Sequence, residues 1–74
     1  MRTLLVKYRG KRSQFEMAEI YGVTQQAWSG WEKGLYKPNV TIMKKIELDS
    51  GISMEDIFFD VFNKNKLLKI KESA

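Results

Sequence analysis

Two adjacent glutamines, Gln25 and Gln26, have side chains suited to reading the edge of a base. Each amide offers a donor and an acceptor in the arrangement that matches N6 and N7 of adenine in the major groove. Thr24 precedes them and is a favourable N-cap residue, so both glutamines are expected in the first turn of a helix. The pattern predicts contacts with A·T base pairs. Composition alone would favour two ordinary surface glutamines.

Side chains for catalysis or metal binding are scarce in this chain of 74 residues. It contains no Cys and no His, which excludes a disulfide, a thiol nucleophile, an imidazole base and a zinc site of the usual ligand types. A single small domain also has little room for a deep substrate pocket beside its own core. We therefore expect no enzyme activity, no cofactor and no metal ion.

The charges divide the chain into unequal parts. Residues 1–37 carry seven Lys or Arg and three Asp or Glu, whereas residues 38–62 carry two and five. The remainder, residues 63–74, has four Lys and one Glu. This distribution predicts one face suited to a polyanion and another turned away from it. The alternative is a set of solvated surface charges without a partner.

Apolar spacing and capping residues predict five helices and no strand, and thus an all-α fold. We expect the helices at about residues 2–9, 14–21, 25–33 and 40–49, with the fifth beginning after Ser53. Ser13 with Glu16 three residues later has the capping-box pattern. The residues expected to face the core in the later helices are Val40, Met43, Ile46, Met54, Ile57 and Phe58.

The segment RSQFEMAEIYGVTQQAWSGWEKGLYKPN, residues 12–39, resembles the Cro and C1 repressor family of DNA-binding domains, also called the XRE family. The resemblance extends over about residues 4–58. It rests on a combination of residues: Gln14, Ala18, Gly22, Val23, Trp28, Trp31, Glu32, Lys33, Gly34, Lys37, Pro38, Ile46, Gly51, Ile52, Ser53, Ile57 and Phe58.

The resemblance implies a compact five-helix domain of the lambda-repressor-like type, in which the second and third helices form a helix-turn-helix. It implies a sequence-specific transcriptional repressor or regulator that places residues 25–33 in the major groove of double-stranded DNA. One such domain reads too few base pairs to find a genomic site, so a dimer on a two-fold operator is expected. It also implies an ion pair between Arg9 and Glu32.

The expected DNA contacts fall into two groups. Gln25, Gln26, Ala27, Ser29 and Gly30 are the expected base-reading positions. Gly30 departs from the family, whose members often carry a long side chain there, so either the backbone approaches DNA closely or discrimination at that base pair is weak. The expected phosphate contacts are Arg12, Gln14, Thr24, Lys33, Tyr36, Lys37 and Asn39.

An aromatic cluster after the fifth helix is a candidate dimer interface. Phe59 and Phe62, continued by Leu67, are expected to supply it. We divide the chain into a DNA-binding domain, residues 1–62, and a basic tail, residues 63–74, which is either disordered, part of this interface or a site for a protein partner. No apolar stretch approaches the length of a membrane span, and a cytoplasmic location is expected.

Three alternatives remain open. A protein-interaction module could keep the helical shape without binding DNA, which Gly30 and the expected exposure of Phe15 would favour. An antitoxin would bind DNA and hold a toxin with residues 63–74. An enzyme is the least favoured alternative, because no nucleophile and base are apparent.

Overall fold

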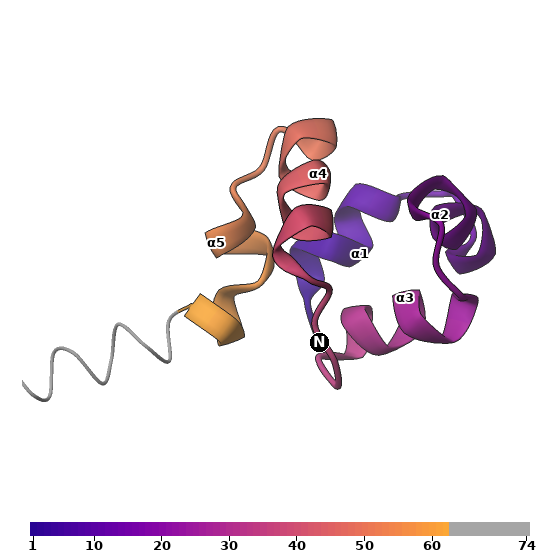
Figure 1. Ribbon diagram of the computed structural model, residues 1–74, viewed down its shortest axis with the longest axis horizontal. Helices are drawn as coiled ribbons and strands as arrows, with labels where there is room; N and C mark the ends of the chain where they lie inside the picture. The colour runs from indigo at the N-terminus through magenta and orange to yellow at the C-terminus, as the bar shows by residue number, and fades with distance from the viewer. Residues whose placement is uncertain (63–74) are drawn as a thin grey trace, which may run out of the picture.

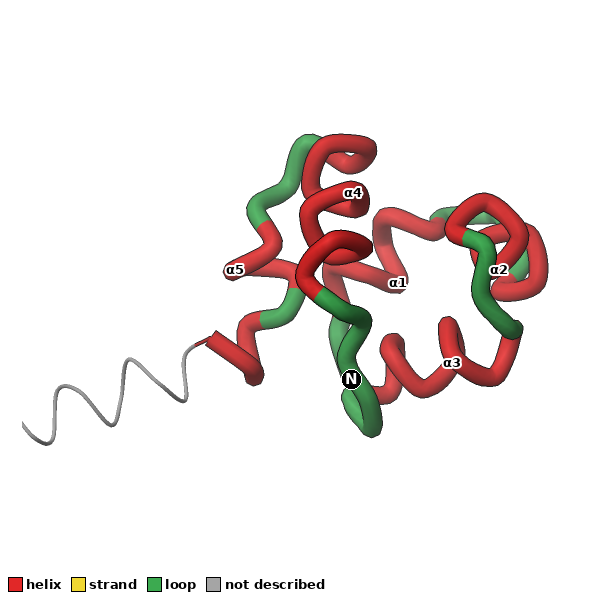
Figure 2. Tube along the Cα trace, in the orientation of Figure 1, coloured by secondary structure: helices red, strands yellow, loops and turns green. Residues whose placement is uncertain are grey.

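The computed structural model describes residues 1–62, which form an all-helical arrangement without strands (Figures 1 and 2). Its helices are α1 (Thr3–Arg9), α2 (Gln14–Tyr21), α3 (Gln25–Lys33), α4 (Val40–Ser50) and α5 (Met54–Ile57). A further helical segment occupies residues 59–62, after a break at Phe58. The expected all-α class is confirmed. The expectation of five helices is corrected by this additional segment.

Local capping chemistry explains where α2 and α3 begin and end. The Ser13 hydroxyl accepts from the Glu16 backbone N–H at 3.0 Å, and the Glu16 carboxylate accepts from the Ser13 N–H at 3.1 Å, so the predicted capping box is confirmed. Gly22 ends α2 at φ 67°, a conformation that glycine adopts without strain. Only Val23 and Thr24 separate Gly22 from α3, so the two helices are joined tightly.

Helix α1 lies at the centre of the arrangement. It packs against α3 on one side and α5 on the other, while α2 packs against α3 and α4 against α5. Figure 1 shows α2 and α3 on one side of α4 and α5 on the other. The core between them consists of Leu5, Met17, Ala18, Tyr21, Trp28, Trp31, Met43, Ile46, Ile57 and Phe58. None of the helices in residues 1–62 is long and apolar enough to cross a membrane.

The interior of α4 and α5 differs from the expectation at two positions. Met43 and Ile46 are buried as predicted, but Val40 is 67% exposed. Val40 is the first residue of α4 and lies one turn before Met43, beyond the part of the helix that the core covers. Met54 is only partly buried, while Ile57 and Phe58 belong to the core as expected.

Candidate functional site

The solvent-facing side of α3 borders a shallow depression of about 430 Å³, which we call the α3 depression. Helix α3 contributes Gln25, Gln26, Ser29, Gly30 and Lys33. Gln14 from α2 and Leu35 and Tyr36 from the loop after α3 complete the lining. Residues four apart on a helix share a face, which explains why positions 25, 29 and 33 lie together beside 26 and 30. The structure thus brings together seven of the residues that the sequence predicts to contact DNA. They are Gln14, Gln25, Gln26, Ser29, Gly30, Lys33 and Tyr36.

The opposite side of α3 is fixed in the core. Trp28 and Trp31 are buried there, and Ala27 packs partly against the same cluster. Ala27 is thus less available than Gln25 and Gln26, which are both exposed. Ser29 is half-buried. The amphipathic division of α3 therefore separates the polar side chains that could meet a ligand from the aromatic ones that hold the helix in place.

A buried carboxylate, Glu32, holds three helices around the α3 depression. Its oxygens accept from Arg9 Nε at 2.7 Å, from Gln14 Nε2 at 2.9 Å and from Trp28 Nε1 at 2.6 Å. The donors come from α1, α2 and α3. Burial by itself would raise the pKa of Glu32, but these hydrogen bonds outweigh it and the pKa is lowered. Glu32 is therefore an ionised residue that fixes where α3 lies.

This network confirms the expected pair of Arg9 and Glu32 and changes the picture of Gln14. Gln14 was expected to contact a phosphate. Its amide nitrogen instead donates one hydrogen bond to Glu32, while the residue still lines the α3 depression. An amide nitrogen carries two N–H groups, so one donor remains for a second acceptor. The Glu32 bond orients the Gln14 amide at the edge of the depression.

Three of the other residues expected to contact phosphate form hydrogen bonds within the fold. Arg12 donates to the carbonyl oxygens of Tyr8 and Arg9, where α1 ends. Thr24 and Asn39 cap α3 and α4 with their side-chain oxygens. These polar groups therefore have a structural role and none of the three residues lines the α3 depression, while their contacts with phosphate stay predictions.

The lysines have a different placement from the arginines. Lys33 and Lys37 are exposed, and Lys33 lines the α3 depression. Arg2 and Arg9 form ion pairs with acidic residues of the same fold. The predicted excess of positive charge in residues 1–37 is therefore partly neutralised internally. In the lining of the α3 depression the positive charge is that of Lys33.

The structure gives a packing reason for a glycine at position 30, which the sequence does not reveal. A Cβ at this position would overlap Cδ2 of Tyr36 and lie 2.8 Å from Cε2, so the tyrosine ring rests directly on the glycine. Gly30 itself is buried, whereas Tyr36 is 64% exposed. Of the two alternatives expected at Gly30, close approach of its backbone to DNA or weak discrimination at that base pair, the covering ring disfavours the first, and both stay untested by the structure. The surface at this point belongs to the Tyr36 ring.

The contact predicts how Gly30→Ala affects stability. Alanine is favoured over glycine inside a helix by about 0.5–1 kcal/mol, but the added methyl must displace the Tyr36 ring. We expect Gly30→Ala to raise the free energy of unfolding by about 0.5–1 kcal/mol in a Tyr36→Ala background and by less, or not at all, in the wild type. Urea unfolding of the four proteins measures both effects. Equal gains in the two backgrounds would contradict the contact.

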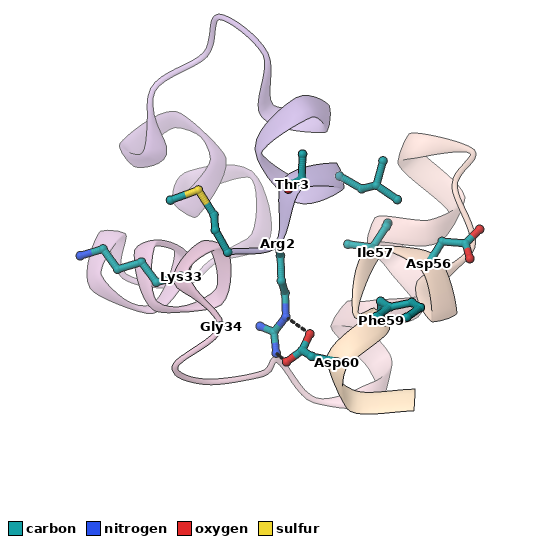
Figure 3. A pocket seen from close by; sticks show the side chains of 10 residues that line it. Arg2, Thr3, Lys33, Gly34, Asp56, Ile57, Phe59 and Asp60 are labelled. Carbon is teal, nitrogen blue, oxygen red and sulfur yellow. Dashed lines mark hydrogen bonds and ion pairs between the residues drawn. The ribbon is translucent and has the colours of Figure 1, made fainter. Parts of the chain in front are cut away.

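Arg2 has a structural role that was not predicted from the sequence. It is only 6% exposed, and its guanidinium donates to the carbonyl oxygens of Trp31 and Tyr36. It also forms two bonds to the Asp60 carboxylate, at 2.9 and 3.0 Å. Figure 3 shows this side chain reaching from the first residues to the last helical segment. Arg2 thereby holds the end of α3 and the start of the following loop.

The pocket in Figure 3 is a second depression, of about 510 Å³, beside the Arg2 and Asp60 pair. Phe59, one of the expected dimer residues, lines it and is 61% exposed. Phe62 is half-buried and packs against the core, so less of it is available for a partner. Leu67, the third expected residue, lies outside the described residues. The dimer interface stays a prediction.

Comparison with family models, curated proteins and solved structures found no match to this chain. Within residues 1–62, no group of three or more acidic side chains is placed to hold a metal ion. The case for a function therefore rests on the α3 depression and the residues that border it. What this surface offers is a row of amides and a hydroxyl, one lysine ammonium and an exposed aromatic ring.

Proposed function

We propose that this protein binds double-stranded DNA by placing the exposed face of α3 in the major groove. In this proposal α2 and α3 act as a helix-turn-helix of the lambda-repressor-like type, in a member of the Cro and C1 repressor family. The observation that carries it is the α3 depression, where Gln25, Gln26 and Ser29 lie together on a helix whose other face is fixed in the core. These side chains have the hydrogen-bonding groups that base edges require.

The electrostatic support for DNA binding comes from lysines near α3. Lys33 stands at the end of the same helical face, and Lys37 follows in the loop after α3. In this proposal both meet the phosphate backbone when α3 enters a groove, and such contacts fix orientation without reading sequence. Acidic side chains are concentrated in residues 38–62, which supply none of the lining of the α3 depression. A polyanion is therefore favoured on one face.

A regulatory role as a dimer in the cytoplasm completes the proposal. Because one helix contacts few base pairs, two copies on a two-fold site supply the discrimination that a genome demands. In this proposal Phe59 contributes to the contact between the copies, since it is exposed and does not line the α3 depression. Binding of this kind at a promoter makes a transcriptional repressor or regulator.

Selection of bound sequences from random duplex DNA tests the proposal. We expect the wild type to enrich an inverted repeat, and the variant Gln25→Ala, Gln26→Ala to lose preference at one or two base pairs of each half-site. Each good amide contact is worth about 1–3 kcal/mol of discrimination. Thr41→Ala, an exposed polar change on α4 outside the α3 depression, is the matched control and should leave the selected sequence unchanged.

The alternative with a structural observation behind it is a protein-interaction module. Phe15 and Ile20 on α2 are 55% and 47% exposed, as the sequence predicts for Phe15, and form no part of the α3 depression. No enriched sequence for the wild type at low salt would reject DNA reading and favour a protein partner at this helix.

A further inference from the structure

One row of side chains on the exposed face of α3 is interrupted. Gln26 and position 30 are neighbours along the helix, about 6 Å apart, and position 30 is a glycine without a side chain. The Tyr36 ring covers this position, because a Cβ on Gly30 would overlap it. An aromatic side chain from the next loop therefore occupies the place that a helix side chain would otherwise fill.

The backbone of Tyr36 is anchored on both sides. The N–H groups of Leu35 and Tyr36 donate to the Gly30 carbonyl oxygen, at 2.9 and 3.4 Å. The Tyr36 carbonyl oxygen in turn accepts from the buried Arg2 guanidinium. These bonds hold the loop against the end of α3, so the fold sets the backbone position from which the Tyr36 ring reaches Gly30.

The chemistry of the exposed ring suits a base edge. Tyr36 borders the same depression as Gln25, Gln26 and Ser29 and remains 64% exposed. Its hydroxyl can donate or accept a hydrogen bond, and its ring offers an apolar surface of the kind that contacts a thymine methyl group.

We propose that Tyr36 is a base-reading residue, which takes the place of the side chain that position 30 cannot carry. This inference rests on the proposed function, and it replaces the phosphate role expected for Tyr36 from the sequence. The glycine and the tyrosine form one unit in this assignment, because the ring reaches its place only while position 30 lacks a Cβ. A change at either residue must therefore affect the same base pair.

The test compares the operators selected from random duplex DNA by the wild type, Tyr36→Ala and Gly30→Ala. We expect Tyr36→Ala to lower discrimination about tenfold at one base pair of each half-site, within the range for a direct base contact. Gly30→Ala should alter preference at that same base pair, because it displaces the ring. The double variant should show no larger loss than Tyr36→Ala alone.

Val40→Ala is the matched control, since Val40 is as exposed as Tyr36 and lies outside the α3 depression. It should leave the selected sequence unchanged. Equal losses on the selected and on random duplexes for Tyr36→Ala would show a phosphate contact and overturn the inference, while Gln25 and Gln26 could still read bases. An unchanged selected sequence for Tyr36→Ala would overturn it as well. A wild type without any preferred sequence would overturn both the inference and the proposed function.

Discussion

Glu32→Ala should lower the free energy of unfolding by about 3–5 kcal/mol, the cost typical of removing one partner from a buried ionic network. Arg9, Gln14 and Trp28 all donate to this carboxylate, and Glu32 is only 3% exposed. A chain of this size has a total stability of similar magnitude, so much of the variant should be unfolded at room temperature. Urea unfolding followed by tryptophan fluorescence measures the change.

Glu19→Ala provides the control, because Glu19 is an exposed carboxylate on α2. Its effect should stay within about 0.5 kcal/mol, as expected for a surface substitution. A loss of equal size in the two variants would show that Glu32 contributes no more than a surface charge and would contradict the network.

The effect of Glu32→Ala should also depend on pH. Hydrogen bonding outweighs burial and lowers the pKa of Glu32 in the folded state, so the carboxylate stabilises the fold fully above its unfolded pKa of about 4.3. That contribution is lost as pH falls through the lower pKa of the folded state. The stability gap between wild type and variant should therefore narrow on acidification from about pH 5 towards pH 2. A constant gap would contradict the lowered pKa.

The second large effect is expected for Arg2→Met, which keeps an apolar stem of comparable length but removes every donor. The carbonyl oxygens of Trp31 and Tyr36 then lose their charged partner, and the Trp31 bond is a buried one. We expect a loss of about 1.5–3 kcal/mol in the free energy of unfolding, the range for hydrogen bonds to charged groups. Thermal and urea unfolding both report it.

Asp60→Asn separates the ion pair from the backbone contacts of Arg2. The Asp60 side chain is 52% exposed, so its pair with Arg2 is weakened by solvent. The Arg2 hydrogen bond lowers the pKa of Asp60, but we expect the substitution to cost less than about 1 kcal/mol. If Asp60→Asn costs as much as Arg2→Met, the ion pair and not the carbonyl contacts would be the main contribution of Arg2.

Local signals were sufficient to predict most of the helices. Ser13, Thr24, Asn39 and Ser53 act as N-caps in the structure, and each uses a side-chain oxygen within three residues of itself. Such contacts depend on the neighbouring sequence alone, which is why the boundaries of α2 and α3 agree with expectation. Val40 shows the limit of this reasoning, because an apolar residue at a helix start is buried only if another element covers it.

The parts of the site that the sequence did not predict depend on distant contacts. Arg2 meets Asp60 across 58 residues, and no local pattern marks an arginine that will be buried. The contact of Tyr36 with Gly30 depends on how the loop folds back over α3. In contrast, Trp28 and Glu32 are four residues apart, a spacing that places both on one side of a helix. That signal was available and was missed.

The division of α3 into two faces has a consequence for how such a protein changes its target. The aromatic residues that hold the helix and the amides that would choose a sequence are different residues, so the second set can be exchanged without weakening the first. Gly30 is the exception, since it is covered by a ring that also borders the exposed surface. Altered specificity should therefore evolve freely at positions 25, 26 and 29, whereas a change at position 30 also displaces the Tyr36 ring.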